Sequence, residues 1–99
     1  MTQLRLTLYV AGDSPRTRQA KANLDRICAE HLGGSAHCRT IDVLDAPATA
    51  EAERILTTPT LVREQPLPRR RVTGDLSDTS RVLVALGLDA GSSDIPTAR

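Results

Sequence analysis

Aromatic side chains are almost absent from this 99-residue chain, which has one tyrosine, Tyr9, and neither tryptophan nor phenylalanine. Proteins that bind single-stranded nucleic acid usually stack the bases on several aromatic rings. The formal net charge of +1 also provides no strong field for a phosphate backbone or an anionic membrane. We therefore expect no nucleic-acid partner and no membrane partner, and a core built from Leu, Val, Ile and Ala.

Cysteine is scarce as well, with Cys28 and Cys38 standing ten positions apart and no C-x-x-C pair. This spacing disfavours a redox site or a zinc site. Cys28 falls on the apolar face of a helical pattern and Cys38 lies inside a strand pattern, so both are predicted to be inert thiols of the kind that cores bury. His31 and His37 have no spacing that would make them ligands. We predict no metal and no cofactor.

Long apolar runs are missing too, since none approaches the ~20 residues that cross a bilayer. The first residues lack a basic segment followed by an apolar one, so a cytoplasmic location is expected. From Asp89 onward the chain is small, polar and without periodicity. The sequence predicts one domain over residues 1–88 and a disordered tail over residues 89–99.

Hydrophobic periodicity predicts helices and strands in alternation. Apolar residues at every second position predict a strand over residues 4–10. Ser14 followed by Pro15 is typical of a helix start, and a stripe of apolar residues at three- and four-residue spacing predicts a helix that ends at Gly33-Gly34. A strand over residues 36–44 follows. Because a helix connects these two strands, they should be parallel.

The second half is predicted to hold a short helix, two strands and a last helix. Asp45 and Pro47 are expected to open the short helix, with Ile55 on its apolar side. Strands are predicted over residues 60–64 and 70–73, and their short connection makes them antiparallel. The last helix is expected over residues 81–86, with Ser77 or Asp78 as its cap.

A proline corner precedes the third strand. Proline cannot donate to a sheet and restricts the residue before it, so the short helix must end near Thr58-Pro59. An X-Pro bond adopts the cis form at a cost of only about 0.5–1 kcal/mol, and Pro59 is a candidate for it. Thr57-Thr58-Pro59-Thr60-Leu61 resembles the cis-proline corner of thioredoxin-like domains. The element order β-α-β-α-β-β-α predicts an α/β fold of that type.

Four blocks of sequence resemble the KaiB family of circadian clock proteins, in register from about residue 4 to 88. The blocks are Leu8-Tyr9-Val10-Ala11-Gly12 with Pro15, Ile41-Asp42-Val43-Leu44, Ile55-Leu56-Thr57-Thr58-Pro59-Thr60-Leu61 and Arg70-Arg71-Val72-Thr73-Gly74-Asp75-Leu76-Ser77. The resemblance implies a protein that is not an enzyme. It implies binding, in the thioredoxin-like form, to the N-terminal ATPase ring of KaiC, a hexameric ATPase and autokinase whose phosphorylation state the family helps to set.

Two alternatives remain beside this interpretation. The sensor domain of the clock-output histidine kinase resembles KaiB, so the chain could instead be an adaptor in a histidine-kinase or stress-signalling pathway. A thioredoxin-like redox protein is a remote alternative, because the turn from Ala11 to Arg16 has no cysteine where such enzymes place one. Ser14 is explained as a helix cap rather than a nucleophile, so no catalytic residue is predicted.

Arginines are the candidate partner-binding residues, by their family position and because the planar guanidinium suits charged interfaces. The set is Arg39, Arg54, Arg63, Arg69, Arg70 and Arg71. Arg69-Arg70-Arg71 is the strongest candidate, since a loop stiffened by two prolines would present the three together.

The resemblance also implies that many family members adopt a second, tetrameric fold when free. In the last helix this chain has Ala85 and Gly87 where the family commonly has Gly and Asp. Alanine is better than glycine in a helix interior by about 1 kcal/mol, and glycine suits a left-handed helix end. We therefore expect the free chain to be mainly thioredoxin-like, as a monomer or weak homodimer, with the tetramer-type fold as the alternative.

Overall fold

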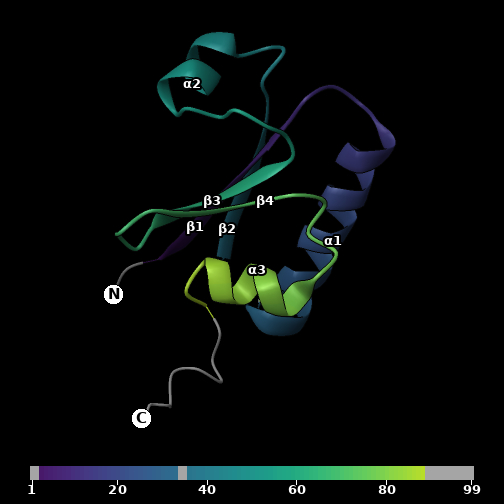
Figure 1. Cartoon of the computed structure of the whole chain (residues 1–99). Coiled ribbons are helices and arrows are strands. Elements are labelled where there is room, and N and C mark those ends of the chain that lie inside the picture. Colours follow the sequence, from purple (N-terminus) through teal and green to yellow (C-terminus); the bar gives the residue numbers. More distant parts are fainter. Residues whose placement is uncertain (1–2, 34–35, 89–99) are drawn as a thin grey trace.

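Four strands form one sheet in the spatial order β2-β1-β3-β4 (Figure 1). They are β1 (Leu4–Val10), β2 (Ala36–Asp42), β3 (Thr60–Gln65) and β4 (Arg70–Thr73). β1 is parallel to β2 and antiparallel to β3, and β3 is antiparallel to β4, as predicted. This computed structural model describes residues 3–33 and 36–88; the predicted tail over residues 89–99 lies outside them.

The described residues also form three helices, α1 (Pro15–His31), α2 (Pro47–Ala52) and α3 (Thr79–Ala85). Figure 1 shows α1 and α3 together on one side of the sheet and α2 away from them. The Ser14 hydroxyl accepts from the Thr17 amide at 3.1 Å, and the Asp78 carboxylate accepts from the Arg81 amide at 3.1 Å. These side chains satisfy amide donors that a helix start leaves unpaired.

The core lies between the sheet and the pair α1 and α3, and it is aliphatic as expected. β1 contributes Leu6, Leu8 and Val10, each at most 2% exposed. They pack with residues of α1, β3, β4 and α3, among them Leu24, Ile27, Leu61, Val72, Val82 and Leu86. Because strand side chains alternate, Thr7 and Tyr9 face the other side of the sheet.

Several predicted boundaries were wrong by a few residues. β2 ends at Asp42 rather than at residue 44, because the Asp42 carboxylate turns the chain by accepting from the amides of Gly12 and Leu44. Asp45 does not cap α2, whose N-cap is Ala46 without a side-chain bond, and Ile55 lies beyond that helix. β3 runs one residue further, to Gln65, and α3 starts at Thr79.

The corner before β3 is built around Pro59. The Thr58–Pro59 peptide bond is cis, as are the bonds before Pro66 and Pro68 in the β3–β4 loop. The Thr60 hydroxyl donates to the Thr57 carbonyl at 2.7 Å, which fixes the entry to β3. The corner therefore delivers the chain directly into the sheet beside β1.

Gly87 ends α3 in a left-handed turn with φ of 70°. Its amide donates to the Val84 carbonyl and the Leu88 amide donates to the Leu83 carbonyl, a pattern known as the Schellman motif. A Cβ at this position would lie 3.1 Å from Nη1 of Arg63. Ala85, two residues earlier and the last residue of α3, packs against the core. Position 87 is thus restricted by backbone conformation and by space.

Substituting this glycine should cost more than substituting a glycine restricted by conformation alone. Gly33 has a similar φ of 59°, but nothing lies within 4 Å of its hypothetical Cβ. We expect Gly33→Ala to lower the free energy of unfolding by about 1 kcal/mol, and Gly87→Ala by roughly 1 kcal/mol more. Urea unfolding of both variants measures the difference. Equal losses would show that the approach of Arg63 does not restrict position 87.

Candidate interaction surface

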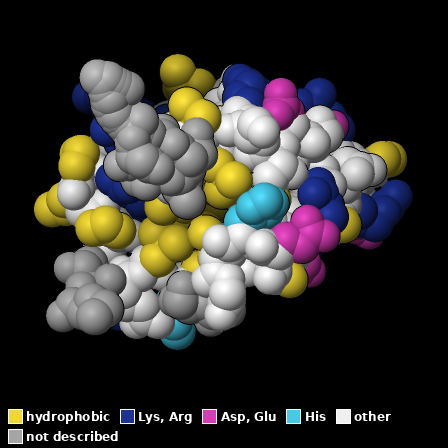
Figure 2. Space-filling view, turned by 90° about the horizontal axis from the view of Figure 1, so that it is seen from below, with side chains coloured by type: hydrophobic (Ala, Val, Ile, Leu, Met, Phe, Trp, Pro, Cys, Tyr) yellow, Lys and Arg dark blue, Asp and Glu magenta, His cyan; other side chains and the backbone are white. Residues whose placement is uncertain are grey.

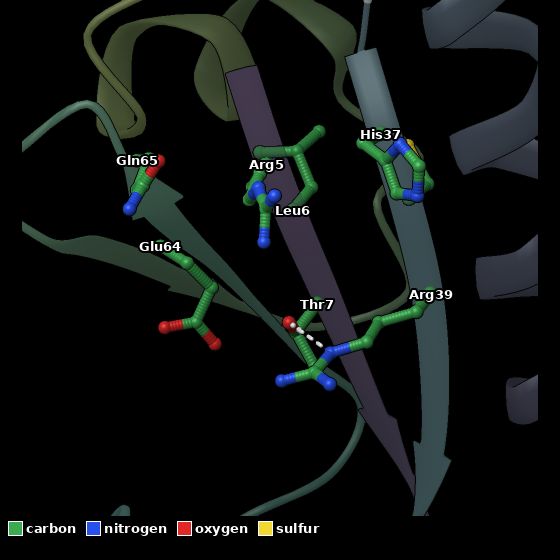
Figure 3. A pocket seen from close by; sticks show the side chains of 8 residues that line it. Arg5, Leu6, Thr7, His37, Arg39, Glu64 and Gln65 are labelled. Carbon is green, nitrogen blue, oxygen red and sulfur yellow. Dashed lines mark hydrogen bonds between the residues drawn. The ribbon is translucent and has the colours of Figure 1, made fainter. Parts of the chain in front are cut away.

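The sheet face opposite α1 and α3 carries a polar cavity of about 430 Å³ (Figure 3). Its lining comes from β1, β2 and β3 and comprises Arg5, Leu6, Thr7, His37, Cys38, Arg39, Glu64 and Gln65. The Arg39 side chain extends from β2 across β1 towards Glu64 of β3, and its Nε donates to the Thr7 hydroxyl at 3.2 Å. Basic and acidic side chains thus line the same face of the sheet, although Glu64 is bonded to Arg69 rather than to Arg39.

Strand register divides the predicted arginines between the two faces. Arg63 pairs with Leu6 on one side and with Arg70 on the other, so these side chains share the face that α1 and α3 cover. Arg71 pairs with Val62 and therefore points to the opposite face. The expectation that Arg69-Arg70-Arg71 forms one patch is wrong, because neighbouring residues of a strand alternate.

Arg63 is buried, with 7% of the residue exposed. Its Nη1 donates to the Leu86 carbonyl at 2.8 Å and its Nη2 to the Pro68 carbonyl at 2.7 Å, while Nε has no partner within the described residues. Leu86 is the C-cap of α3, where a cation also meets the negative end of the helix dipole. Arg63 therefore joins the end of α3 to the β3–β4 loop.

Arg69 and Arg71 hold the turn that follows α2. Arg69 bonds to the carboxylates of Glu53 and Glu64, the second at 2.8 Å. Arg71 donates to the main-chain carbonyls of Glu53 and Arg54 at 2.9 and 3.0 Å. The bonds of both arginines fasten the end of α2 to the start of β4. The two carboxylates, chiefly through the hydrogen bond from Arg69 to Glu53, raise the pKa of Arg69.

The remaining arginines are exposed. Arg54 ends α2 in a left-handed conformation with φ of 56°, in the same Schellman pattern as Gly87. In the part of the chain that the structure describes, the guanidinium groups of Arg54 and Arg70 have no hydrogen-bond or ion-pair partner. Basic side chains occur at several separate places on the face shown in Figure 2, rather than in one continuous patch.

Removing the Arg63 side chain should therefore destabilise the fold, whereas removing that of Arg70, its cross-strand partner, should not. We expect Arg63→Ala to lower the free energy of unfolding by about 3 kcal/mol, because two charged hydrogen bonds are lost and two carbonyls lose their donor. Arg70→Ala, at the paired exposed position, should change it by less than about 0.5 kcal/mol. Denaturant unfolding compares the two; similar values would contradict the structural role of Arg63.

Tyr9 lies under this surface and is almost fully buried. Burial raises the pKa of its phenol above 10.0, and the nearby carboxylates of Glu64 and Glu53 raise it further. A raised pKa means that the folded chain holds the phenolic proton more tightly than the unfolded chain does. Stability is therefore unaffected below pH 10 and declines as the pH rises above it.

This titration can be followed directly, since Tyr9 is the only tyrosine and tryptophan is absent. Tyrosinate absorbance should show a midpoint above pH 10 in the folded chain and close to 10 in denaturant. Tyr9→Phe should remove the alkaline loss of stability attributable to the phenol. A native midpoint at or below that of the denatured chain would contradict the assignment.

The cysteines are not arranged as predicted. Cys38 is exposed rather than buried, Cys28 is half-buried, and their sulfur atoms lie 3.2 Å apart. The linear separation of ten positions concealed this pair, because only the packing of α1 against β2 brings the residues together. The turn between β1 and α1 has no thiol, and the described residues contain no group of three potential metal ligands. His31 and His37 are both exposed.

Solved structures place the fold among thioredoxin-like proteins. The chain matches the N-terminal domain of Synechococcus elongatus SasA with a TM-score of 0.73 and 22% identity, covering 93% of this chain and 88% of that one. It matches chloroplastic thioredoxin z with a TM-score of 0.69 and 21% identity, over 90% and 80% of the two chains. These likenesses establish the architecture: a thioredoxin-like domain whose first turn has no cysteine.

The sequence identifies the family more narrowly. The KaiB domain model matches residues 7–88. Circadian clock protein KaiB3 from a Synechocystis strain is 48% identical over 89 residues, which cover 90% of this chain and 85% of the relative. The KaiB clock oscillator protein of Synechococcus elongatus is 46% identical over 83 residues, 84% of this chain and 81% of the relative. This chain belongs to the KaiB family, whose role is in circadian clock regulation.

Among the described residues no helix is both long and apolar enough to span a membrane. The arginine positions and the fold-preference positions, Ala85 and Gly87, are all described. Of these, Arg63 and Arg70 lie beside Gly87 at the end of α3, which the sequence could not show because it depends on how α3 packs against β3 and β4.

Proposed function

We propose that this chain is a regulatory protein without enzymatic activity that binds a KaiC-like hexameric ATPase and alters its phosphorylation state. The observation that supports this most directly is the family match over residues 7–88, with curated clock relatives near 45–48% identity. The domain in its described part also offers no thiol in the turn after β1. The absence of a thiol at the position that redox enzymes of this fold use supports partner binding rather than thiol chemistry as the proposed activity.

The exposed arginines are proposed to contact the ATPase from more than one face of the domain, because Arg39 lies on the sheet face opposite the helices and Arg70 on the helix side. Arg39, Arg54 and Arg70 keep all or most of their donor groups available, because Arg39 uses only Nε and the other two have no partner in the described part of the chain. Arg63, which is buried, and Arg69 and Arg71, which are exposed but bonded to other groups, are proposed to act indirectly, by fixing the β3–β4 loop and the turn after α2. Removing an arginine of either kind should lower the affinity: an exposed one because a contact is lost, and a bonded one because the loop or turn is no longer fixed.

A pull-down from lysate of the source organism, identified by mass spectrometry, tests the partner. Recovery of a KaiC-like ATPase is expected. Recovery of a histidine kinase in its place would support the alternative adaptor role, for which the SasA likeness adds no support because it shows a shared fold only. Phosphorylation of the purified ATPase should then change when the chain is added, and an unchanged phosphorylation state would contradict the proposal.

Substitutions can separate contact residues from supporting residues. The triple variant Arg39→Gln, Arg54→Gln, Arg70→Gln should weaken binding to the purified ATPase by about tenfold or more, at nearly unchanged stability. It should also reduce the salt dependence of the affinity. Arg18 on α1 forms an exposed ion pair with Asp13, which precedes the helix; Arg18→Gln serves as the control and should leave affinity unchanged.

Arg54 permits a sharper test because its backbone is left-handed. Arg54→Gly should raise the free energy of unfolding by up to about 1 kcal/mol and at the same time weaken binding. A supporting role alone would couple the two effects, so stability and affinity would rise together. A variant that is more stable and binds as tightly as the parent would remove Arg54 from the proposed interface.

We further propose that the free chain is mainly thioredoxin-like, as a monomer or weak dimer. Gly87 provides the left-handed end of α3 and Ala85 packs against the core, and both favour this form. A bias of roughly 1–2 kcal/mol shifts two folds of similar energy about five- to thirty-fold. Light scattering should report a small species and binding should have no slow phase. A tetramer, or slow onset at saturating ATPase, would contradict this.

A further inference from the structure

The pairing of Cys28 with Cys38 follows from the packing of α1 on the edge of the sheet. Cys38 lies on β2, which is the outer strand next to β1, and pairs in register with Leu6. Its side chain therefore points to the face that α1 covers. Cys28 lies near the carboxyl end of α1, where it packs against the core. The two sulfur atoms meet at 3.2 Å, about 1 Å more than the ~2.05 Å of a disulfide bond.

We propose that Cys28 and Cys38 form a reversible disulfide when the folded chain meets a small-molecule disulfide such as oxidised glutathione. The thiolate of Cys38 attacks one sulfur of that disulfide, a mixed disulfide forms at Cys38, and one small thiolate leaves. Cys28 then loses its proton to solvent and attacks the Cys38 sulfur, releasing the second small thiolate. The two cysteines are oxidised by two electrons and the small disulfide is reduced to two thiols.

The order of attack follows from exposure and hydrogen bonding. Cys38 is exposed, whereas Cys28 is half-buried. Burial, and the hydrogen bond to Cys38, raise the pKa of the Cys28 thiol to about 12, so that it stays protonated while Cys38 reacts. Once Cys38 is joined to the small thiol, the contribution of a Cys38 thiolate to this shift disappears. Cys28 is then the neighbouring thiol that completes the exchange.

A cavity of about 300 Å³ gives access to Cys38. It is lined by Leu8, Lys21, Leu24, Asp25, Cys38 and Thr40. Its lining carries one group of each sign, the Lys21 ammonium, which would favour an anionic disulfide, and the Asp25 carboxylate, which would oppose it. The site is open at the surface, so the incoming molecule needs no rearrangement of α1 to reach the sulfur.

The pair differs from the redox centre of thioredoxin-like enzymes in position and in consequence. Those enzymes use a helix N-terminus to lower a thiol pKa, but Cys28 lies in the last turns of α1, where the dipole opposes a thiolate. The pair should therefore hold a stable disulfide rather than pass it rapidly to substrates. It is a modification site that fastens the end of α1 to the edge strand, and it adjoins Arg39 of the proposed ATPase-contacting set while Arg70 lies on the opposite edge strand.

The experiment equilibrates the purified chain with mixtures of reduced and oxidised glutathione, then alkylates free thiols and measures the intact mass. The chain should convert to a monomeric form that lacks two hydrogens and takes no alkylating group. Cys28→Ser should accumulate one glutathione adduct at Cys38, and Cys38→Ser should react at least tenfold more slowly. Both variants are isosteric, and circular dichroism establishes that they remain folded.

Three results would overturn the proposal. The first is a wild-type chain that remains doubly alkylated in excess oxidised glutathione, or ends with two glutathione adducts. The second is a disulfide between two chains in place of one within the chain. The third concerns thermal stability. A disulfide that closes the loop between Cys28 and Cys38 should raise Tm by about 10 °C. An oxidised chain with an unchanged or lower Tm would show that native geometry does not accommodate the bond.

Discussion

In every strand of this sheet successive side chains point to opposite faces, and that alternation governs both the core and the surface. On the central strand β1 it sends Leu6, Leu8 and Val10 towards the helices and Thr7 and Tyr9 away from them. A shift of one residue would reverse each of these assignments. Because Tyr9 is the only aromatic residue, no large aromatic side chain could replace the aliphatic core that such a shift would expose.

The same alternation separates arginines that are adjacent in the sequence. Arg70 and its cross-strand partner Arg63 lie on the helix side, where Arg63 bonds to the end of α3, while Arg71 lies on the other side and bonds to the turn after α2. Arginine thus serves the fold and the proposed interface with one kind of group. Its fixed fork of donors suits both purposes, because it satisfies two carbonyls at once or presents several donors to a partner.

The two cysteines and the exposed arginines give the molecule two separate chemistries. The thiol pair lies between α1 and the edge strand β2, next to Arg39, whereas Arg54 follows α2 and Arg70 lies on the opposite edge strand β4. A modification of the thiol pair would therefore lie beside Arg39 but at the opposite edge of the sheet from Arg70. Within the KaiB family this chain is a thioredoxin-like domain in which the usual catalytic turn lacks cysteine and thiols occur at the far end of the first helix.

The sequence by itself determined the element order, the aliphatic core and the family, because periodicity, Ser14-Pro15, the corner at Pro59 and the block motifs are local features. Tertiary structure alone decided which arginines are available. Arg63 and Arg70 have the same charge, and only the packing of α3 buries one of them. Tertiary structure also decided that Cys38 is exposed and lies beside Cys28, since a separation of ten positions in the sequence does not reveal that α1 packs against β2. Local patterns report faces and ends, whereas contacts between distant segments depend on how whole elements pack.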